Sequence, residues 1–594
     1  MNYQKLGRDI FIRYLSVRFS AVSGMIILGK PDLVLIHPPS MYDFRRESIL
    51  YGPISDVVPS TPIFEMYPLG FISLMGYLES YGFHVHIVNL AVKMLRNRGF
   101  NPEDYLSKIN AKAYGIDIHW LVHAHGGVEV AKILKRIKPN RPVIIGGLSS
   151  TYFHREIIRS YLDIDYIVRG DSGEYPLLKL MECIEGDKYP VDVPNITWRD
   201  RDGRIHENPL THIPELIDKY IINYEYAVKN VVRHLNIEDY LPYRDWLSYP
   251  YCALTTCRGC SQNCTTCGGS AYSFSKIYGR KEVALKSPEV LVDEMRIIQS
   301  YFKSPIFLLG DIWQRGDEHG LKILKLIRRE GIDNPITFEL FNPLSIDKIV
   351  EIKRSCSEFS IEISPESHDE DVRKAQGRLY SNKALEEMIE NCLNNECIKL
   401  DVFFMIGLPK QTPRSVIETI DYCDKLLLKH HDGRLHTFIA PLAPFLDPGS
   451  IAFENPDSIG YKLIFKTFNE HREALKKPSW KYCLNYETEW MSRSQIVDLT
   501  YNAAKAINDI RFKHNIIDKN SYEEIRRKID LTEYITKRID EIIAKGDKLE
   551  ELKKHVVEDY GILCSREELR SVPIAKVKWI RGGLKLMLRY LHIV

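Results

Sequence analysis

Short apolar runs alternate with amphipathic stretches over residues 31–186. Runs of this length, bounded by turn residues, predict buried strands. We expect strands at 33–40, 84–90, 113–120, 141–147 and 165–171, with helices at 68–82 and 126–137. Continuously apolar strands that alternate with helices form a parallel sheet covered on both faces, and its ligands lie at the carboxyl ends of the strands. The residues expected to face that crevice are Pro38, Pro39, His119, Gly146 and Gly147.

A second alternating series runs from Tyr251 to about Ile451 and predicts a βα barrel or partial barrel. Its expected strands are 251–256, 306–311, 336–341, 359–364, 399–408 and 436–442. The polar segment between the two series predicts a small hairpin followed by a connecting helix, and the chain after about Asp457 is mostly helical in pattern. The predicted domains are 1–186, 187–245, 246–455 and 456–594.

Charge and composition exclude several classes of protein. Lys and Arg number 81 and Asp and Glu 79, a formal net charge of +2, so nothing indicates a nucleic-acid partner. No run of 18 apolar residues occurs, and the nearest candidate, 11–29, contains Arg13 and Arg18. We expect a cytoplasmic protein. Five of the 12 cysteines lie between Cys252 and Cys267, and this clustering favours metal ligation.

The segment TTCRGCSQNCTTCGGS (255–270) carries the most specific pattern in the chain. Cys260, Cys264 and Cys267 form C-x3-C-x2-C directly after a predicted strand. Three thiolates can hold three irons of a [4Fe–4S] cluster and leave the fourth iron open to S-adenosylmethionine (SAM). With Cys257 the segment also contains two C-x2-C pairs, which allows a zinc site or a cluster with four cysteine ligands. Otherwise Cys252 and Cys257 are packing residues.

At these residues the chain resembles the radical SAM superfamily. That resemblance implies that Cys260, Cys264 and Cys267 hold the cluster. Further matches imply SAM contacts: LGD (309–311) with Asp311, the stretch 361–385 with Glu366, and MIGLPKQT (405–412) with Gly407, Leu408 and Pro409. The stretch 442–450 matches a sixth-strand ending. Thr266 stands where the family usually has an aromatic residue, which weakens the expected adenine contact at that position.

Residues 31–186 resemble the cobalamin-binding domain of many radical SAM enzymes through 68–85, 143–150 and 165–180. The resemblance implies a flavodoxin-like sheet with cobalamin over its strand ends, near Gly146 and Gly147. The motif D-x-H-x-x-G, which supplies a histidine to cobalt, is absent after the first strand. Asp117 and His119 give D-x-H on another strand, but Val122 replaces the glycine, so no cobalt ligand is assigned. His119, His123 and His125 are either metal ligands or structural histidines.

The tail 571–594 holds five basic residues and no acidic residue, and Lys578, Arg581, Lys585 and Arg589 recur at helical spacing. A wide apolar stripe beside them is typical of a helix on an anionic lipid surface, and the alternative is a helix docked on the protein core. Together with the domains, this tail makes the chain similar to archaeal radical SAM enzymes that form rings in tetraether lipids. The resemblance implies an apolar or lipid substrate and peripheral membrane contact.

The predicted function is therefore reductive cleavage of SAM followed by hydrogen abstraction from an unactivated C–H bond, with ring or other carbon–carbon bond formation. The first alternative is a cobalamin-dependent radical methyltransferase. The second is a non-catalytic, metal-stabilised binding protein, which would not cleave SAM. The expected partners are a small-molecule or lipid substrate and an electron donor such as ferredoxin or flavodoxin.

Overall fold

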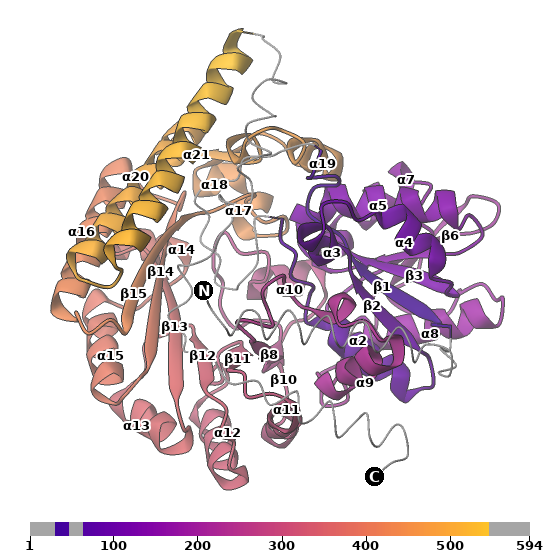
Figure 1. The fold of residues 1–594 in the computed structure, drawn as a ribbon, viewed down its shortest axis with the longest axis horizontal. Coiled ribbons are helices and arrows are strands. Elements are labelled where there is room, and N and C mark those ends of the chain that lie inside the picture. Colours follow the sequence, from indigo (N-terminus) through magenta and orange to yellow (C-terminus); the bar gives the residue numbers. More distant parts are fainter. Residues whose placement is uncertain (1–29, 47–62, 546–594) are drawn as a thin grey trace, which may run out of the picture.

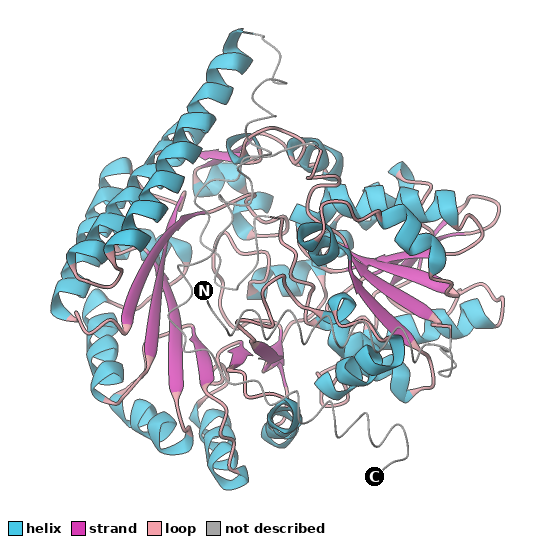
Figure 2. Cartoon of the chain, viewed as in Figure 1, coloured by secondary structure: helices cyan, strands magenta, loops and turns pink. Residues whose placement is uncertain are grey.

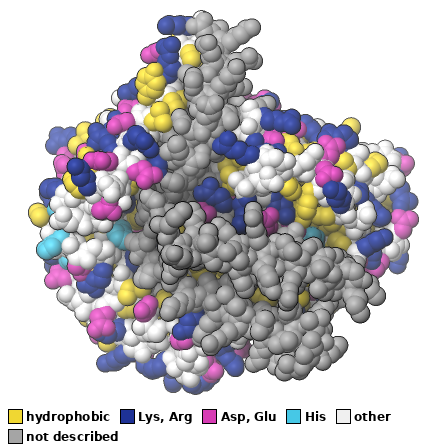
Figure 3. Space-filling model, viewed as in Figure 1, with side chains coloured by type: hydrophobic (Ala, Val, Ile, Leu, Met, Phe, Trp, Pro, Cys, Tyr) yellow, Lys and Arg dark blue, Asp and Glu magenta, His cyan; other side chains and the backbone are white. Residues whose placement is uncertain are grey.

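The computed structural model describes residues 30–46 and 63–545. The apolar segment 11–29 and the basic tail 571–594 lie outside these described residues, so their predictions are untested. Among the described helices, none combines the length and the apolar character that crossing a membrane requires. Cationic and anionic side chains are interspersed over the described part of the face in Figure 3.

The N-terminal domain is built on a seven-stranded sheet in the order β2-β1-β3-β4-β5-β6-β7. Its first five strands pair in parallel and reproduce the flavodoxin-like order, as predicted. Helices α3, α4, α5 and α7 lie on one face, and α2, α8 and α9 lie on the other (Figure 1). The parallel strands are β1 (Leu33–His37), β2 (Val85–Asn89), β3 (Ala113–Asp117), β4 (Val143–Gly146) and β5 (Tyr166–Val168).

The longer helices of this domain bury an apolar face. In α5, for example, Val128, Ala131 and Leu134 are fully buried at helical spacing. The helices are α2 (Gly70–Ser80), α3 (Leu90–Arg96), α4 (Pro102–Lys108), α5 (Ala124–Ile137), α6 (Leu148–Tyr152), α7 (His154–Ser160) and α8 (Glu174–Glu185), with a 3-10 turn at Leu121–His123.

The predicted hairpin between the two domains is present, but it belongs to the N-terminal sheet. Strand β6 (Ile196–Arg199) pairs antiparallel with β5, and β7 (Ile205–Glu207) pairs antiparallel with β6. The predicted connecting helix is α9 (Tyr224–His234), which packs on α2 and on α11 of the next domain. A 3-10 turn follows at Glu238–Tyr240.

The central domain is a six-stranded parallel sheet in the order β15-β14-β13-β12-β11-β8, curved into the predicted partial barrel (Figure 2). Alternate residues such as Leu254, Phe338 and Ile361 are buried against the outer helices, and the residues between them face the inside. The strands are β8 (Cys252–Thr255), β11 (Ile306–Leu309), β12 (Ile336–Leu340), β13 (Phe359–Glu366), β14 (Lys399–Ile406) and β15 (Leu435–Pro441).

Four of the six barrel helices begin at a residue whose side chain caps the first turn. Ser287 and Thr412 each accept a hydrogen bond from a first-turn amide, with proline at the first helical position. The helices are α11 (Pro288–Tyr301), α12 (Asp317–Glu330), α13 (Ile346–Ser355), α14 (Glu370–Gln376), α15 (Asn382–Asn394) and α16 (Pro413–Lys429). Between β8 and α11 lie β9 (Cys257–Arg258), α10 (Ala271–Ile277) and β10 (Ala284–Leu285).

The C-terminal region is mostly helical, as predicted, with one small hairpin. Helix α20 (Arg493–Lys513) packs on α16 and β15 and carries α21 (Lys519–Lys545), which projects from the molecule (Figure 1). The remaining elements are α17 (Ile451–Glu454), α18 (Pro456–Ile459), β16 (Tyr461–Leu463), α19 (Phe468–Ala474), a 3-10 turn at Trp480–Tyr482, and β17 (Tyr486–Thr488).

Candidate cofactor sites

A cavity of about 590 Å³ lies between the N-terminal sheet and the barrel and is lined by both. From the N-terminal domain it receives the carboxyl ends of the strands, as expected for a ligand of such a sheet. From the barrel it receives the inward-facing residues of β8 and β11 and the start of the cysteine loop. Representative lining residues are Asp117, Gly146, Gly147, Tyr251, Cys257 and Leu309.

The predicted cobalamin glycines both line this cavity, at the end of β4. Gly147 has φ +119°, and a Cβ atom there would lie 2.4 Å from the Cα of His119. Only glycine therefore allows the end of β4 to approach the end of β3 so closely. Gly146 is different, because a Cβ atom there would meet nothing closer than 3.8 Å.

Several polar side chains lie at or after the carboxyl ends of β1 and β3. His37 shares a 2.9 Å hydrogen bond with Asp117, and the rings of His37 and His123 both contact the carbonyl of Phe64. Burial lowers the pKa of His123 to about 4, so this ring is neutral. His119 lines the cavity itself. His125 is buried and accepts a hydrogen bond from the amide of Tyr42, which is a structural contact.

The three predicted cluster cysteines lie together on the loop between β9 and α10. Burial raises the pKa of the Cys260 thiol to about 11, and each thiolate would raise the pKa of its neighbours. Backbone amides of Gln262 and Gly269 donate to the sulfurs of Cys260 and Cys267, each at 3.3 Å. Iron would replace the protons, and amide donors to thiolate sulfur are what iron–sulfur sites use. The donor set therefore fits a cluster.

Within the described residues, no three His, Cys, Asp or Glu side chains converge to hold a single metal ion. Each cysteine of a [4Fe–4S] cluster binds a different iron, so such a site does not need that convergence. Cys257 precedes the three along the chain, its sulfur accepts a hydrogen bond from Gln314 at 3.2 Å, and it lines the cavity. Cys252 is buried in β8, where Ser304 donates to it, consistent with packing.

The loop that follows β13 and α14 supports the cysteine loop. The amide of Thr265 donates to the carbonyl of Gln376, whose side chain donates to the hydroxyl of Thr266 at 2.7 Å. Gly377 has φ +101°, and a Cβ atom there would lie 2.8 Å from the carbonyl oxygen of Asn263. Thr266, where the family has an aromatic residue, is buried and serves this contact instead.

Asp311 follows β11 and is 4% exposed, and burial raises its pKa. Both of its carboxylate oxygens accept backbone hydrogen bonds, from Trp313 at 2.8 Å and from Phe341 at 2.9 Å. The structure thus shows Asp311 joining the ends of β11 and β12. Its predicted contact with the SAM amino group stays a prediction.

Glu366 ends β13 with φ +70° after a β-bulge, a conformation that non-glycine residues rarely adopt. Burial raises its pKa to about 7, although Arg378 opposes that shift. The Arg378 guanidinium lies 3.8 Å from the Glu366 carboxylate and is near Cys264 and Cys267, whose thiolate forms it would stabilise. Its Nε is buried and makes no hydrogen bond. Sequence reasoning missed Arg378, although it lies inside the stretch 361–385.

The turn after β14 is closed by Gln411, whose side-chain oxygen accepts from the amides of Gly407 and Leu408. Gly407 has φ +101°, and a Cβ atom there would lie 2.2 Å from the hydroxyl of Tyr486. Leu408 is fully buried and Pro409 continues the turn. The predicted Gly-Leu-Pro segment is thus a tight turn at a barrel strand end, and its predicted contact with SAM stays a prediction.

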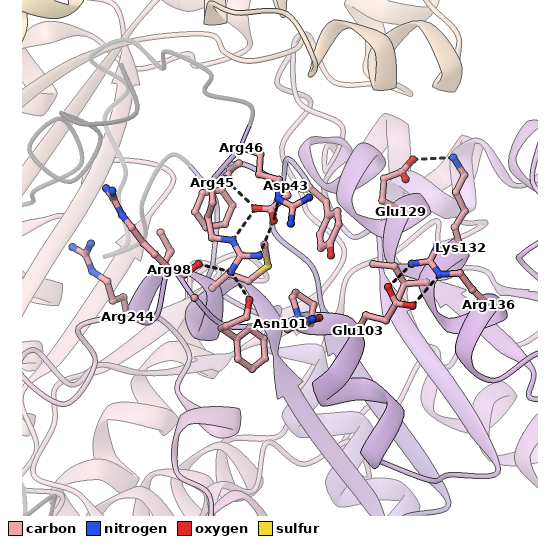
Figure 4. Close-up of a pocket in the computed structure, with 18 residues that line it drawn as sticks. Asp43, Arg45, Arg46, Arg98, Asn101, Glu103, Glu129, Lys132, Arg136 and Arg244 are labelled. Carbon is pink, nitrogen blue, oxygen red and sulfur yellow. Dashed lines mark hydrogen bonds and ion pairs between the residues drawn. The ribbon is translucent and has the colours of Figure 1, made fainter. Parts of the chain in front are cut away.

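A second cavity, of about 760 Å³, is lined by the segment after β1, the end of α3, the start of α4 and one face of α5 (Figure 4). Its cations are largely neutralised. Arg45 pairs with Asp43, Lys132 with Glu129, and Arg136 with Glu103. Neither predicted cofactor motif contributes to this cavity, and we assign it no ligand.

Two family models match the chain. The B12-binding domain matches residues 56–179, and the radical SAM superfamily matches residues 254–423. The chain thus joins a cobalamin-type domain to a radical SAM domain. This is the arrangement of cobalamin-dependent radical SAM enzymes, whose cofactors are a [4Fe–4S] cluster, SAM and cobalamin.

Two curated proteins are similar over part of their length. The anaerobic magnesium-protoporphyrin IX monomethyl ester cyclase of Rubrivivax gelatinosus is 22% identical over 48% of this chain and 50% of its own. The cytidylyl-2-hydroxyethylphosphonate methyltransferase of Streptomyces wedmorensis is 23% identical over 48% of this chain and 60% of its own. The alignments thus span between half and three fifths of these relatives.

Among solved structures, the cobalamin-dependent SAM radical enzyme OxsB with aqua-cobalamin bound has the same fold. It aligns with a TM-score of 0.53 and 12% identity over 95% of this chain and 80% of its own.

Proposed function

We propose that this chain is a radical methyltransferase that places a methyl group on an unactivated carbon of a small-molecule substrate. The cavity between the two domains carries the proposal, because strand ends of the cobalamin-type domain and the start of the cysteine loop line the same space. A substrate held there would face both cofactors. This function replaces lipid ring formation as the leading hypothesis, since a methyltransferase is among the similar proteins.

When bound, the cluster and SAM would supply a 5′-deoxyadenosyl radical for hydrogen abstraction, and cobalamin would supply the methyl group. Cys260, Cys264 and Cys267 are proposed to hold the cluster. Arg378 is proposed to bind the SAM carboxylate, because its buried Nε lacks a hydrogen bond and it lies against the cysteine loop. Glu366 at the strand end would accept hydrogen bonds from the ribose.

The cavity wall itself would exclude water from the reacting carbon. Phe64, Trp120, Tyr243 and Phe307 contribute aromatic surface to it, and a dry cavity protects a carbon radical from side reactions. Gly146 and Gly147 are proposed to lie closest to the corrin.

The test is a product analysis with the anaerobically loaded protein, a low-potential reductant, SAM deuterated in its methyl group, and small-molecule extracts. Methyl transfer would release S-adenosylhomocysteine and 5′-deoxyadenosine in equal amounts and add a labelled methyl group to one component. Release of 5′-deoxyadenosine without S-adenosylhomocysteine, from protein that holds cobalamin, would contradict methyl transfer.

The second candidate is carbon–carbon bond formation on an apolar substrate. The aromatic and aliphatic cavity wall and the similarity to a cyclase favour it. It would yield 5′-deoxyadenosine and a product of lower hydrogen content, with no added methyl group. Contact of the tail 571–594 with an anionic lipid surface, and a ferredoxin or flavodoxin as electron donor, belong to the proposal for either reaction.

A further inference from the structure

Two arginines that flank the cysteine loop reach into the N-terminal domain. Arg258 lies between Cys257 and Cys260, and Arg280 follows α10. Their partners are Glu174, the first residue of α8, and Asp171, on the loop that joins β5 to α8. We call these two ion pairs, Glu174–Arg258 and Asp171–Arg280, the domain bridge.

The first pair of the domain bridge is bidentate and largely buried. Arg258 donates from Nη1 to Glu174 at 2.9 Å and also from Nη2, and the Glu174 side chain is 3% exposed. Burial opposes ionisation of Glu174, but the charge and hydrogen bonds of Arg258 hold its pKa below the usual value. Ser73 donates to the same carboxylate at 2.6 Å, and the guanidinium lies 4.8 Å from the ring centre of Tyr220.

The second pair supports the backbone that leads to Cys260. Arg280 is 3% exposed and donates to Asp171 from Nη2 at 3.1 Å and from Nε, and to the carbonyl of Pro214 at 2.9 Å. Gly259 has φ +88°, and a Cβ atom there would lie 2.8 Å from the Cδ of Arg280. The Arg280 stem thus packs against the residue that directly precedes Cys260.

The acidic residues of the domain bridge stand beside the cobalamin-type strand ends. Asp171 and Glu174 line the cavity together with Gly146 and Gly147, and Arg258 lines its other side. A paired arginine and carboxylate fix orientation as well as distance, because the planar guanidinium meets two oxygens at once.

We propose that the domain bridge sets the distance between the two cofactors, with Arg258 and Arg280 as positioning residues that act through Glu174 and Asp171. The inference rests on the proposed function only in taking the cysteine loop as the cluster site and the N-terminal strand ends as the cobalamin site. Other contacts also join the N-terminal domain to the rest of the chain. The hydroxyl of Tyr278 donates to the carbonyl of Leu148, which lines this cavity, at 3.4 Å, and further contacts lie outside the cavity lining. The ion pair between Glu129 and Arg472 of α19 is one of them.

Pulsed EPR of the reduced holoenzyme, in which cluster and cobalt are both paramagnetic, tests the proposal by measuring the spin–spin distance distribution. We expect one narrow distribution for the wild type and a broadened or shifted one for Glu174→Gln and for Arg280→Gln. Arg258→Lys keeps the charge but not the bidentate geometry. Its distance distribution should therefore be intermediate between that of the wild type and those of Glu174→Gln and Arg280→Gln. Glu129→Gln removes an ion pair between domains outside the cavity and should match the wild type.

The rate of turnover should fall in the variants in which the distance between the two cofactors changes. Displacement of reacting groups by about 1 Å can cost on the order of a hundredfold in rate, so Arg280→Gln, whose side chain is outside the cavity wall, should lose activity to that extent. If Glu174→Gln or Arg280→Gln fails to fold or to load, Arg258→Lys and Arg280→Lys carry the same measurement.

Unchanged distributions in the variants of the domain bridge would overturn the proposal, and so would equal broadening in Glu129→Gln. A wild-type protein that holds both cofactors at one distance but does not methylate would contradict the proposed function instead. The distance measurement needs no substrate, so the two failures are distinguishable.

Discussion

Replacement of Gly147 by alanine tests how the end of β4 is fitted against β3. Gly147 has φ +119° and ψ 172°, a region that is essentially restricted to glycine. The new Cβ would lie 2.4 Å from the Cα and 2.5 Å from the amide nitrogen of His119. Both are backbone atoms, so no side-chain rotation relieves the contact, and the end of β3 must move.

The expected cost has two parts. Backbone strain of this kind costs about 1–3 kcal/mol and overpacking costs about 1–3 kcal/mol, so the N-terminal domain should lose about 2–6 kcal/mol of stability. Because folded domains are stable by only about 5–15 kcal/mol, much of the variant would be near its unfolding threshold. The distorted strand end should also retain less cobalamin.

Urea denaturation of the apo protein, followed by cobalamin stoichiometry after loading, measures both effects. Gly146→Ala is the matched control, since its Cβ would meet nothing closer than 3.8 Å and should leave the unfolding midpoint unchanged. Equal midpoints for Gly147→Ala and Gly146→Ala would refute the reasoning about the approach of β4 to β3.

Three further predictions concern buried charges. Arg378→Gln should weaken SAM binding by about 1.5–3 kcal/mol, or about ten- to a hundredfold in Kd by calorimetry, and unchanged affinity would remove Arg378 from the SAM site. Glu366 has its pKa raised by burial from 4.5 to about 7, so the folded state binds the extra proton between these values. Its contribution to stability is present below about pH 4.5 and is lost as the pH rises through 7, by up to about 3 kcal/mol. Glu366→Gln should remove that pH dependence from the free energy of unfolding measured by denaturation. If the free energy of the variant changes with pH as much as that of the wild type, Glu366 is not its source. Lys286 and Glu294 form a fully buried ion pair at 2.7 Å, so Lys286→Met should destabilise by about 3–5 kcal/mol. Lys286→Met combined with Glu294→Gln should recover part of that loss in the same assay, and full additivity would contradict the pairing.

The sequence predicted the fold well because its signals are local. Apolar runs of strand length that alternate with helices fix a parallel sheet, and every strand expected at 33–171 and 251–442 is present within a few residues. The hairpin at 196–207 was also predicted, but its attachment to β5 was not. That attachment depends on the pairing of β6 with β5, and the local pattern of apolar and polar residues does not indicate which strands pair.

The candidate sites were predictable to a lesser extent. Cys260, Cys264 and Cys267 are close in sequence, so their spacing favours a cluster without any knowledge of the fold. The partnership of Arg258 with Glu174 spans 84 residues and two domains, and no local pattern indicates it. Asp311 shows the converse, because its position in a motif predicts a ligand contact while the structure uses both oxygens for backbone amides.

The most direct test of the account is the formation of 5′-deoxyadenosine. The protein would be reconstituted anaerobically with iron and sulfide, then given a reductant and SAM. The control is a variant with Cys260→Ala, Cys264→Ala and Cys267→Ala together. The account predicts 5′-deoxyadenosine from the intact protein only. A fully loaded protein that forms none even with candidate substrates, or equal formation by the triple variant, would contradict it.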